Sequence, residues 1–196
     1  MTAAKRLPFI TEEEYLAGEA LSPVKHEYVD GTVYAMAGSV NVHSRIGYRM
    51  GFRFGARLEG GRCIPFVFEV KVRVRVRKHR RYYYPDGGVT CDPNPPGDTW
   101  EDNPVVLWEV ISESTRRTDQ GEKLDAYLTL PSLRVYLLVE SSRHLIVAHR
   151  RVGAEFVREV YEGLDAVVPL PEIGTELTLR EVYQGIEFVP EEAEQP

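Results

Sequence analysis

The run Val105-Val106-Leu107-Trp108-Glu109-Val110-Ile111 places one carboxylate among six apolar side chains. A continuous apolar run of about 4 to 8 residues is typical of a strand that is buried on both faces. A helix is predicted over residues 119–130, because the spacing of Asp119 and Glu122 is a capping signal and Pro131 ends the segment. Residues 135–139 form another apolar run. Strand, helix and strand in this order predict a βαβ unit with two parallel strands.

The segments around this unit predict further strands and helices. Thr11 and Glu14 form a capping-box pattern, which predicts a short helix over residues 12–17. The pair Asp30-Gly31 favours a tight turn, so a hairpin is expected over residues 25–37. The remaining expectations are a strand at 70–77 with one valine face and one basic face, a turn at 78–81, a tyrosine-rich strand carrying Asp86, a loop at 92–97, antiparallel strands at 145–150 and 155–161, and a helix at 179–184.

A longer helix is predicted over residues 42–58, with two stripes of side chains at four-residue spacing. Gly47, Gly51 and Gly55 form one stripe, which allows close backbone packing. The opposite face is basic, and we expect it to contact either solvent or a polyanion, with solvent as the simpler interpretation. The basic residues are Arg45, Arg49, Arg53 and Arg57.

Composition predicts a single domain over residues 1–188, followed by a disordered acidic tail at 189–196. No apolar run reaches the roughly 20 residues of a membrane span, and no secretory signal is visible, so the cytoplasm is the predicted location. The net charge of −6 argues against a protein that coats nucleic acid nonspecifically. Cys63 and Cys91 do not have the pattern of a zinc site or a disulfide framework, and both are expected to be small buried side chains.

Two carboxylates give the clearest chemical signal in the chain. Asp86 ends the stretch Tyr82-Tyr83-Tyr84-Pro85-Asp86, and Glu109 follows 23 residues later (109 − 86). Carboxylates that meet from neighbouring strands make the oxygen-rich site that Mg²⁺ or Mn²⁺ prefers, which points to metal-assisted phosphodiester hydrolysis. Other interpretations remain open: Asp86 as a turn residue after proline, and Glu109 as one half of a buried structural ion pair.

Three further residues are candidates for the same site. Lys123 flanks the apolar stripe of the predicted helix, so its ammonium group can reach the end of the Glu109 strand, although an exposed lysine is the simpler interpretation. Glu27, in the first hairpin strand, could complete the carboxylate set, although a surface glutamate is the usual explanation for such a residue. His43, near the start of the helix at 42–58, could position water or phosphate, but a lone histidine near a helix end is more often a cap or packing residue.

Five blocks of this sequence resemble the Uma-two family of restriction-type endonucleases, a branch of the PD-(D/E)xK superfamily. Their order and spacing match over residues 10–188. The resemblance implies a mixed β-sheet flanked by helices and a Mg²⁺-dependent nuclease site. The blocks are HEYVDGTVYAMAG at 26–38, HSRI at 43–46, YYPD at 83–86, WEVISEST at 108–115 and DQGEKLDAY at 119–127.

The resemblance also implies a role for individual residues. Asp86 matches the aspartate of the PD element, and Glu109 matches the acidic residue of the second element. Ile111 stands where the superfamily lysine would follow, and Lys123 matches the lysine that this family carries on the next helix. Glycines at 87 and 88 replace the usual β-branched residues, so a weaker strand is expected there.

Glu27 matches the early acidic residue of the family, and His43 matches its histidine. The expected function is therefore an endonuclease that hydrolyses DNA with Mg²⁺ or Mn²⁺ held by Asp86, Glu109 and Glu27, with Lys123 and His43 completing the catalytic set. The residues expected to contact phosphates are Arg45, Arg49, Arg73, Arg75 and Arg77.

The sequence leaves open two alternative functions and one possible assembly. The first alternative is a noncatalytic nucleic-acid-binding or assembly module that retains the fold. The second is a structural scaffold in which Glu109 and Lys123 form a buried ion pair. A homodimer is a candidate assembly, because the glycine stripe permits close packing and many restriction-type relatives are dimers.

Overall fold

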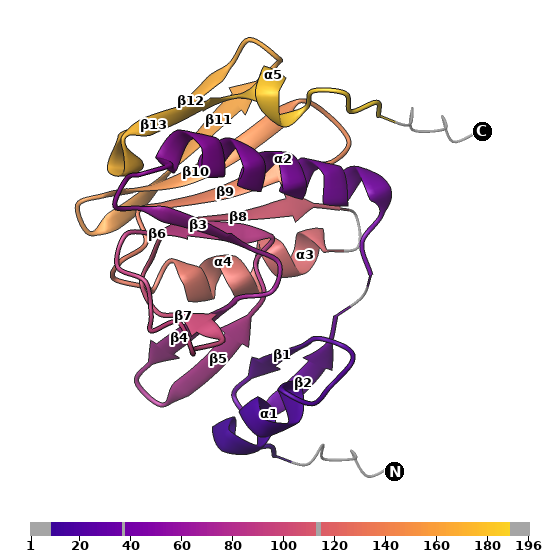
Figure 1. Ribbon diagram of the computed structural model, residues 1–196, viewed down its shortest axis with the longest axis vertical. Coiled ribbons are helices and arrows are strands. Elements are labelled where there is room, and N and C mark those ends of the chain that lie inside the picture. Colours follow the sequence, from indigo (N-terminus) through magenta and orange to yellow (C-terminus); the bar gives the residue numbers. More distant parts are fainter. Residues whose placement is uncertain (1–8, 37, 113–114, 189–196) are drawn as a thin grey trace, which may run out of the picture.

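Figure 1 shows the computed structural model, which describes residues 9–36, 38–112 and 115–188. Helices and mixed sheets combine in this part of the chain, which confirms the expected α/β fold. The predicted acidic tail at 189–196 lies outside the described residues. The elements are α1 (Glu12–Glu19), β1 (His26–Val29), β2 (Thr32–Ala35), α2 (Asn41–Leu58), β3 (Ile64–Val67), β4 (Lys71–Val76), β5 (His79–Tyr83), β6 (Gly87–Thr90), β7 (Trp100–Glu101), β8 (Pro104–Ile111), α3 (Arg116–Asp119), α4 (Glu122–Tyr127), β9 (Val135–Glu140), β10 (Leu145–Val152), β11 (Glu155–Glu162), β12 (Val167–Leu170), the 3₁₀ helix η1 (Pro171–Ile173), β13 (Thr175–Thr178) and α5 (Leu179–Val182).

The predicted βαβ unit lies within a six-stranded sheet of the described residues, with the strand order β11-β10-β9-β8-β6-β3. β8 and β9 are parallel, with Val106 opposite Val135, and the other neighbouring strands are antiparallel. The parallel pair and the antiparallel strands at β10 and β11 are therefore confirmed. No helix in the described ranges is long and apolar enough to cross a membrane.

Helices cover both faces of this sheet. Side chains alternate along a strand, so Trp108 and Glu109 of β8 point to opposite faces. α2 covers the Trp108 face, where its Phe54 ring lies 5.1 Å from the Trp108 ring between centroids. Tyr127 of α4 packs with Ile111 on the other face. Figure 1 shows α2 on one side of β8 and the α3–α4 pair on the other, so Glu109 faces α4.

A second sheet runs in the order β2-β1-β5-β4-β7 among the described residues. Its β1–β2 hairpin confirms the predicted turn, because Asp30 (φ 48°) and Gly31 (φ 95°) both adopt the positive φ that a type I′ turn requires. The turn predicted at 78–81 is wrong. β4 and β5 pair up to Val76 and His79, so only the two residues between them make the reversal.

The capping box of Thr11 and Glu14 is confirmed at the start of α1. A second capping box, formed by Thr178 and Glu181, starts α5 and was not among the expectations. The short strands β7, β12 and β13 were not predicted either, because runs of two to four residues carry little periodic signal. α5 is shorter than the helix expected at 179–184.

The helix predicted over residues 119–130 is wrong in its extent. Two short helices, α3 and α4, replace it, and the break falls at Gly121 (φ −120°, ψ −98°). A Cβ at this position would lie 2.7 Å from the carbonyl oxygen of Arg117, so the close approach of the two segments requires glycine. Asp119 therefore ends α3 and does not cap the following helix.

The helix predicted at 42–58 is confirmed as α2, and its glycine stripe is used within the chain. A Cβ at Gly47 would lie 2.9 Å from the Phe68 ring, and one at Gly51 would lie 2.7 Å from Val67. Among the described residues, nothing lies within 4 Å of a Cβ built at Gly55. Two of the three glycines thus let β3 and the residue after it pack closely on α2.

The arginine face of α2 contacts the C-terminal segment over most of its length. Arg49 and Arg53 both donate to Oε1 of Gln184. Arg57 donates to both carboxylate oxygens of Glu181, at 2.9 and 2.8 Å. The arginine face is therefore partly solvated, with Arg45 and Arg57 exposed, but three of its residues are bonded to the C-terminal segment.

Cys63 and Cys91 form a disulfide, so the expectation of two separate buried thiols is wrong. The antiparallel register of β3 and β6 pairs Ile64 with Thr90. Continuing that register by one residue brings the two cysteines opposite each other. The spacing of 28 residues has no local periodicity, so only the strand pairing reveals the bond.

Candidate active site

Asp86 and Glu109 meet at one end of the β6–β8 pair. The antiparallel register places Gly87 opposite Trp108, and one further step places Asp86 opposite Glu109. The carboxylate of Asp86 accepts the backbone N–H of Val110 at 2.7 Å. Asp86 lies between β5 and β6, so the prediction of a tyrosine-rich strand that carries it is wrong. Its carboxylate is nevertheless bonded to the backbone of the residue that follows Glu109.

The glycine pair after Asp86 does not weaken the strand in the expected way, because β6 is paired with β3 on one side and β8 on the other. A Cβ at Gly87 would lie 2.1 Å from the Trp108 ring, and one at Gly88 would lie 2.4 Å from the Phe66 ring. Aromatic rings thus occupy the space that β-branched side chains would need. The pair is required for packing next to Asp86.

Lys123 lies at the centre of the site and is only 6 % exposed, so the interpretation as an exposed lysine is wrong. Its Nζ lies 2.9 Å from Glu27 Oε1, 3.2 Å from Glu109 Oε1 and 3.5 Å from Asp119 Oδ1. Ile111, at the strand position where a lysine is expected, is fully buried in the apolar core. The cation reaches Glu109 from α4 instead of from β8.

Glu27 joins the site from the five-stranded sheet. Its side chain is 13 % exposed, so the interpretation as a surface glutamate is wrong. Glu27 Oε1 accepts a hydrogen bond from Lys123 and another, at 3.2 Å, from the backbone N–H of Tyr84. Because Tyr84 precedes Pro85-Asp86, this bond ties Glu27 to the segment that carries the aspartate.

His43 contacts Asp86 from the first turn of α2. Its Nε2 lies 2.8 Å from Asp86 Oδ2, and both side chains are 13 % exposed. The cap interpretation is not supported, because α2 has Val40 at its N-cap and no side-chain cap hydrogen bond. The structure therefore brings all five sequence-predicted candidates, Glu27, His43, Asp86, Glu109 and Lys123, into one connected cluster.

Two members of the cluster were not among the predicted site residues. Asp119 is 3 % exposed and supplies the third carboxylate near Lys123. Tyr127 donates its hydroxyl to Glu109 Oε1 at 3.3 Å. Both are four residues from Lys123 in sequence, so helical spacing could have placed them beside it.

Burial and mutual attraction both shift the ionisation of these groups. Burial raises the pKa of Asp86, although His43 and the Val110 N–H favour its charged form. Burial also raises the pKa of Glu109 well above its ordinary value, and Lys123 offsets only part of this effect. Burial alone would lower the pKa of Lys123, but the surrounding carboxylates outweigh it and raise that pKa well above its ordinary value. Lys123 is therefore a fixed cation in the neutral pH range.

The donor chemistry of the site suits Mg²⁺ or Mn²⁺ at Asp86 and Glu109. The described residues contain no group of three or more His, Cys, Asp or Glu side chains arranged to hold a metal ion. Mg²⁺ commonly binds through one or two carboxylates and completes its shell with water and substrate phosphate. In each of the three carboxylates one oxygen already has two partners, namely Oε1 of Glu27, Oε1 of Glu109 and Oδ2 of Asp86, so the other oxygen is the one that could bind a metal.

The arginines predicted to contact phosphates lie outside this cluster. Arg73 makes two hydrogen bonds to Asp102 and stacks on Trp100 at 4.6 Å, and Arg75 pairs with Glu12. None of the five predicted arginines bonds to the carboxylates of the cluster within the described ranges. The remaining three are Arg45, Arg49 and Arg77, of which Arg49 donates to Gln184 and the other two are exposed.

Comparison with known proteins extends these findings. A family model, Uma2, described as "putative restriction endonuclease", matches residues 12–180. An uncharacterized protein of Synechocystis is 33 % identical over 183 residues, which covers 92 % of this chain and 95 % of the relative. A second uncharacterized Synechocystis protein is 27 % identical over 147 residues, covering 74 % and 82 %. A crystal structure of a putative nuclease of the DUF820 class from Anabaena variabilis shares the fold, with a TM-score of 0.69, 18 % identity and coverage of 89 % and 97 %.

Proposed function

Because the chain belongs to the Uma2 family, whose description is "putative restriction endonuclease", we propose that it hydrolyses phosphodiester bonds in DNA with a bound divalent metal ion. The observation that carries this proposal is the position of Lys123 Nζ, 3.2 Å from Glu109 Oε1 and 2.9 Å from Glu27 Oε1. Ile111 occupies the strand position where the superfamily has a lysine, and Lys123 of α4 contacts Glu109 in its place. The contact between an acidic residue and a lysine is thus present although the lysine comes from a different element, and this supports a catalytic role.

Asp86 and Glu109 would hold the metal ion, with Glu27 contacting it through water. A Mg²⁺ or Mn²⁺ ion there would lower the pKa of a bound water and neutralise charge on the phosphate. Lys123 would orient the attacking water or stabilise developing negative charge as a positioned cation. His43 would hold Asp86 in its orientation through the 2.8 Å contact.

The cytoplasm and a homodimer also remain predictions. The disulfide between Cys63 and Cys91 bears on the location, because a reducing cytoplasm keeps most cysteines as thiols. Gly47 and Gly51 pack against residues of their own chain, so they no longer support the homodimer. Thiol titration of freshly purified protein and sedimentation analysis address these two predictions.

The test of the proposed activity is cleavage of supercoiled plasmid and linear DNA with Mg²⁺, Mn²⁺ or EDTA. We expect Asp86→Ala and Lys123→Ala each to lose about a hundredfold or more in rate, the range for a positioned catalytic group. Asp125→Ala, on the exposed side of α4, is the matched control and should cleave like wild type. Equal cleavage by all four proteins would refute the assignment. Circular dichroism establishes that each variant is folded.

The noncatalytic alternative predicts a different result in the same samples. A binding or assembly module would bind DNA in EDTA with strong salt dependence and would show no cleavage with either metal ion. Its binding would be unchanged in Asp86→Ala. Isothermal titration of Mg²⁺ into wild type and Asp86→Ala distinguishes the structural scaffold from the nuclease. The scaffold predicts no metal binding that depends on Asp86.

A further inference from the structure

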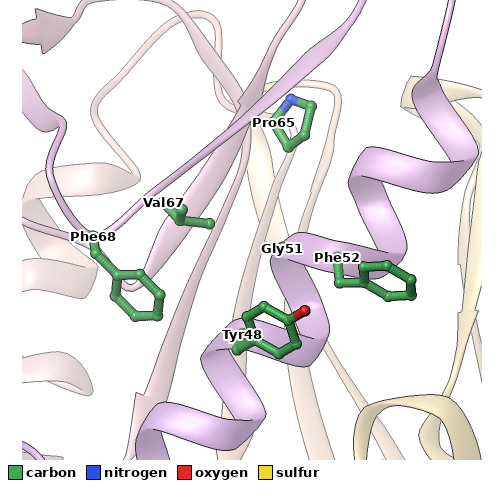
Figure 2. A pocket seen from close by; sticks show the side chains of 6 residues that line it. All are labelled: Tyr48, Gly51, Phe52, Pro65, Val67 and Phe68. Atoms are coloured by element: carbon green, nitrogen blue, oxygen red, sulfur yellow. The ribbon is translucent and has the colours of Figure 1, made fainter.

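An apolar hollow lies on the surface between α2 and β3, close to the candidate active site. Its volume is about 180 Å³. A cavity of about 150 Å³ is large enough for benzene, so this hollow can accept one flat ring. Figure 2 shows side chains of α2 on one side and side chains of β3 and the residue after it on the other. The lining residues are Tyr48, Gly51, Phe52, Pro65, Val67 and Phe68.

Two aromatic rings of this hollow are left open to solvent. Tyr48 is 64 % exposed and Phe52 is 51 % exposed. The rings stack on each other with centroids 6.2 Å apart and an interplanar angle of 19°. Exposed apolar surface is unfavourable in water, so a partner that covers these two rings would be stabilised by their burial.

One wall of the hollow is bonded to the backbone of the candidate active site. Phe68, in its wall, donates its backbone N–H to the carbonyl oxygen of Asp86 at 3.5 Å. His43, which contacts Asp86, precedes Tyr48 by five residues and Phe52 by nine on α2. At about 1.5 Å and roughly 100° per residue, the rings lie roughly 8 and 14 Å further along the helix axis than His43 and roughly 140° and 180° around it. A strand that joins the two sites therefore passes across α2 and spans at least about two to four nucleotides at 3.4 Å per step.

The charges beside the two rings are complementary to a polyanion. α2 carries no Asp or Glu. In its N-terminal half, Arg45 is exposed and Arg49 donates only to the neutral amide oxygen of Gln184. Neither arginine has a carboxylate partner among the described residues, in contrast to Arg57 near the end of the helix, which pairs with Glu181. The positive charge that is left uncompensated is thus on the half of α2 nearest to Asp86.

We propose that Tyr48 and Phe52 form a stacking platform for an unpaired nucleobase of the DNA strand whose phosphate enters the candidate active site, an inference that rests on the proposed function. Bases in a duplex already stack on their neighbours, so stacking on an aromatic platform is favourable only for bases that are single-stranded or extruded. Arg45 and Arg49 contact the phosphates that flank this base. The preferred substrate is therefore single-stranded DNA, or duplex DNA with an unpaired segment.

A second copy of this chain is a less suitable occupant of the hollow. A two-fold contact through Tyr48 and Phe52 would bring the same surface of both copies together. Arg45 and Arg49 of one copy would then face the like charges of the other, which opposes association. The same arginines attract the phosphate backbone of a DNA strand.

The test is binding in EDTA, where no cleavage occurs, so its outcome is separate from that of the proposed nuclease activity. Fluorescence anisotropy compares a labelled single strand with a duplex of the same sequence, and 2-aminopurine in the single strand reports stacking. We expect Tyr48→Ala and Phe52→Ala each to weaken single-strand binding by at least about fivefold, the lower end of the base-stacking effect, with less than about twofold change for the duplex. Tyr48→Phe should bind like wild type, since stacking does not need the hydroxyl.

Val157→Ala truncates a half-exposed apolar side chain on β11, at the opposite edge of the six-stranded sheet, and is the matched control. It should leave both affinities unchanged. Unchanged single-strand binding in the Tyr48 and Phe52 variants, or equal losses on single strand and duplex, would overturn the inference. Sedimentation showing a wild-type dimer that these two substitutions dissociate would also overturn it and assign the hollow to a second copy. If the binding results are as expected but wild type cleaves no DNA with either metal ion, the stacking platform stands and only the proposed nuclease activity is refuted.

Discussion

Replacing Lys123 by methionine is the sharpest perturbation of this site. The substitution keeps most of the side-chain volume but removes the ammonium group that lies 2.9, 3.2 and 3.5 Å from three carboxylates. Removing one partner from a buried ion pair costs about 3–5 kcal/mol, because the remaining charge is left without compensation. Lys123 is 6 % exposed, so water cannot replace it without opening the structure. We therefore expect Lys123→Met to lower the free energy of unfolding by about 3–5 kcal/mol.

The assay is urea unfolding in EDTA, followed by tryptophan fluorescence and circular dichroism. Lys25→Met is the matched control, because Lys25 pairs with Glu69 at 2.6 Å but the glutamate side chain is 79 % exposed. Exposed pairs contribute about 0–1 kcal/mol, and the hydrogen bond from Lys25 to the Phe68 carbonyl oxygen adds about 0.5–1.5 kcal/mol, so the control should lose no more than about 2 kcal/mol. A loss for Lys123→Met no larger than the loss for Lys25→Met would refute the reasoning.

Two further measurements on Lys123→Met test the cause of its instability. Without Lys123 the carboxylates should take up protons at a higher pH than in wild type, so the stability gap between wild type and variant should narrow as pH falls toward the wild-type pKa of Glu109, which burial already raises. Mg²⁺ should restore part of the loss if the carboxylates bind it, by about 2.7 kcal/mol at a hundredfold excess over its Kd. A gap that is independent of pH would contradict the electrostatic explanation.

The remaining predictions concern positions outside the cluster of carboxylates. Burial alone would raise the pKa of Asp102, but the hydrogen bonds from Arg73 outweigh it and lower that pKa, so the pair stabilises the fold above the unfolded pKa of about 3.9 and this contribution is lost as pH falls through the lower, folded value. Asp102→Asn should therefore lower the free energy of unfolding by about 1–2 kcal/mol at pH 7. Unfolding curves that show the same loss at pH 3 would contradict this prediction. Cys63→Ser opens a covalent link across 28 residues and should cost about 3–4 kcal/mol under oxidising conditions and nothing relative to wild type in reductant, as measured by thermal unfolding. Gly87→Ala places a Cβ 2.1 Å from a buried tryptophan ring and should cost at least about 1–3 kcal/mol, whereas Gly97→Ala, which has open space in the described structure, should be neutral in the same assay.

Local signals in the sequence predicted most of the elements that build the site. The hairpin at Asp30-Gly31 and the capping box at Thr11 depend on residues that are neighbours in the chain, and both are confirmed. The apolar run at 105–111 predicted a strand buried on both faces, which is β8. These predictions succeed because turn geometry, capping and periodicity are determined within a few residues.

The failures arise where distant segments meet. The break at Gly121 depends on the approach to the Arg117 carbonyl, and the disulfide depends on the register of β3 and β6. Asp119 has the i,i+4 spacing to Lys123 that would be read as a surface pair, and only its burial makes it part of the site. Such features carry no distinct local pattern.

The sequence by itself determined that Asp86 and Glu109 are carboxylates in apolar surroundings, which need a partner because burying a lone charge is costly. It also indicated which residue types could serve. The sequence offered Lys123 as a candidate partner of Glu109, and the tertiary structure decided that the two meet and that the same ammonium group reaches Glu27, 96 residues away in the chain (123 − 27). The physical reason is that a desolvated charge is stabilised by whichever opposite charge the fold brings within about 3 to 4 Å, and that distance is set by sheet register and helix packing.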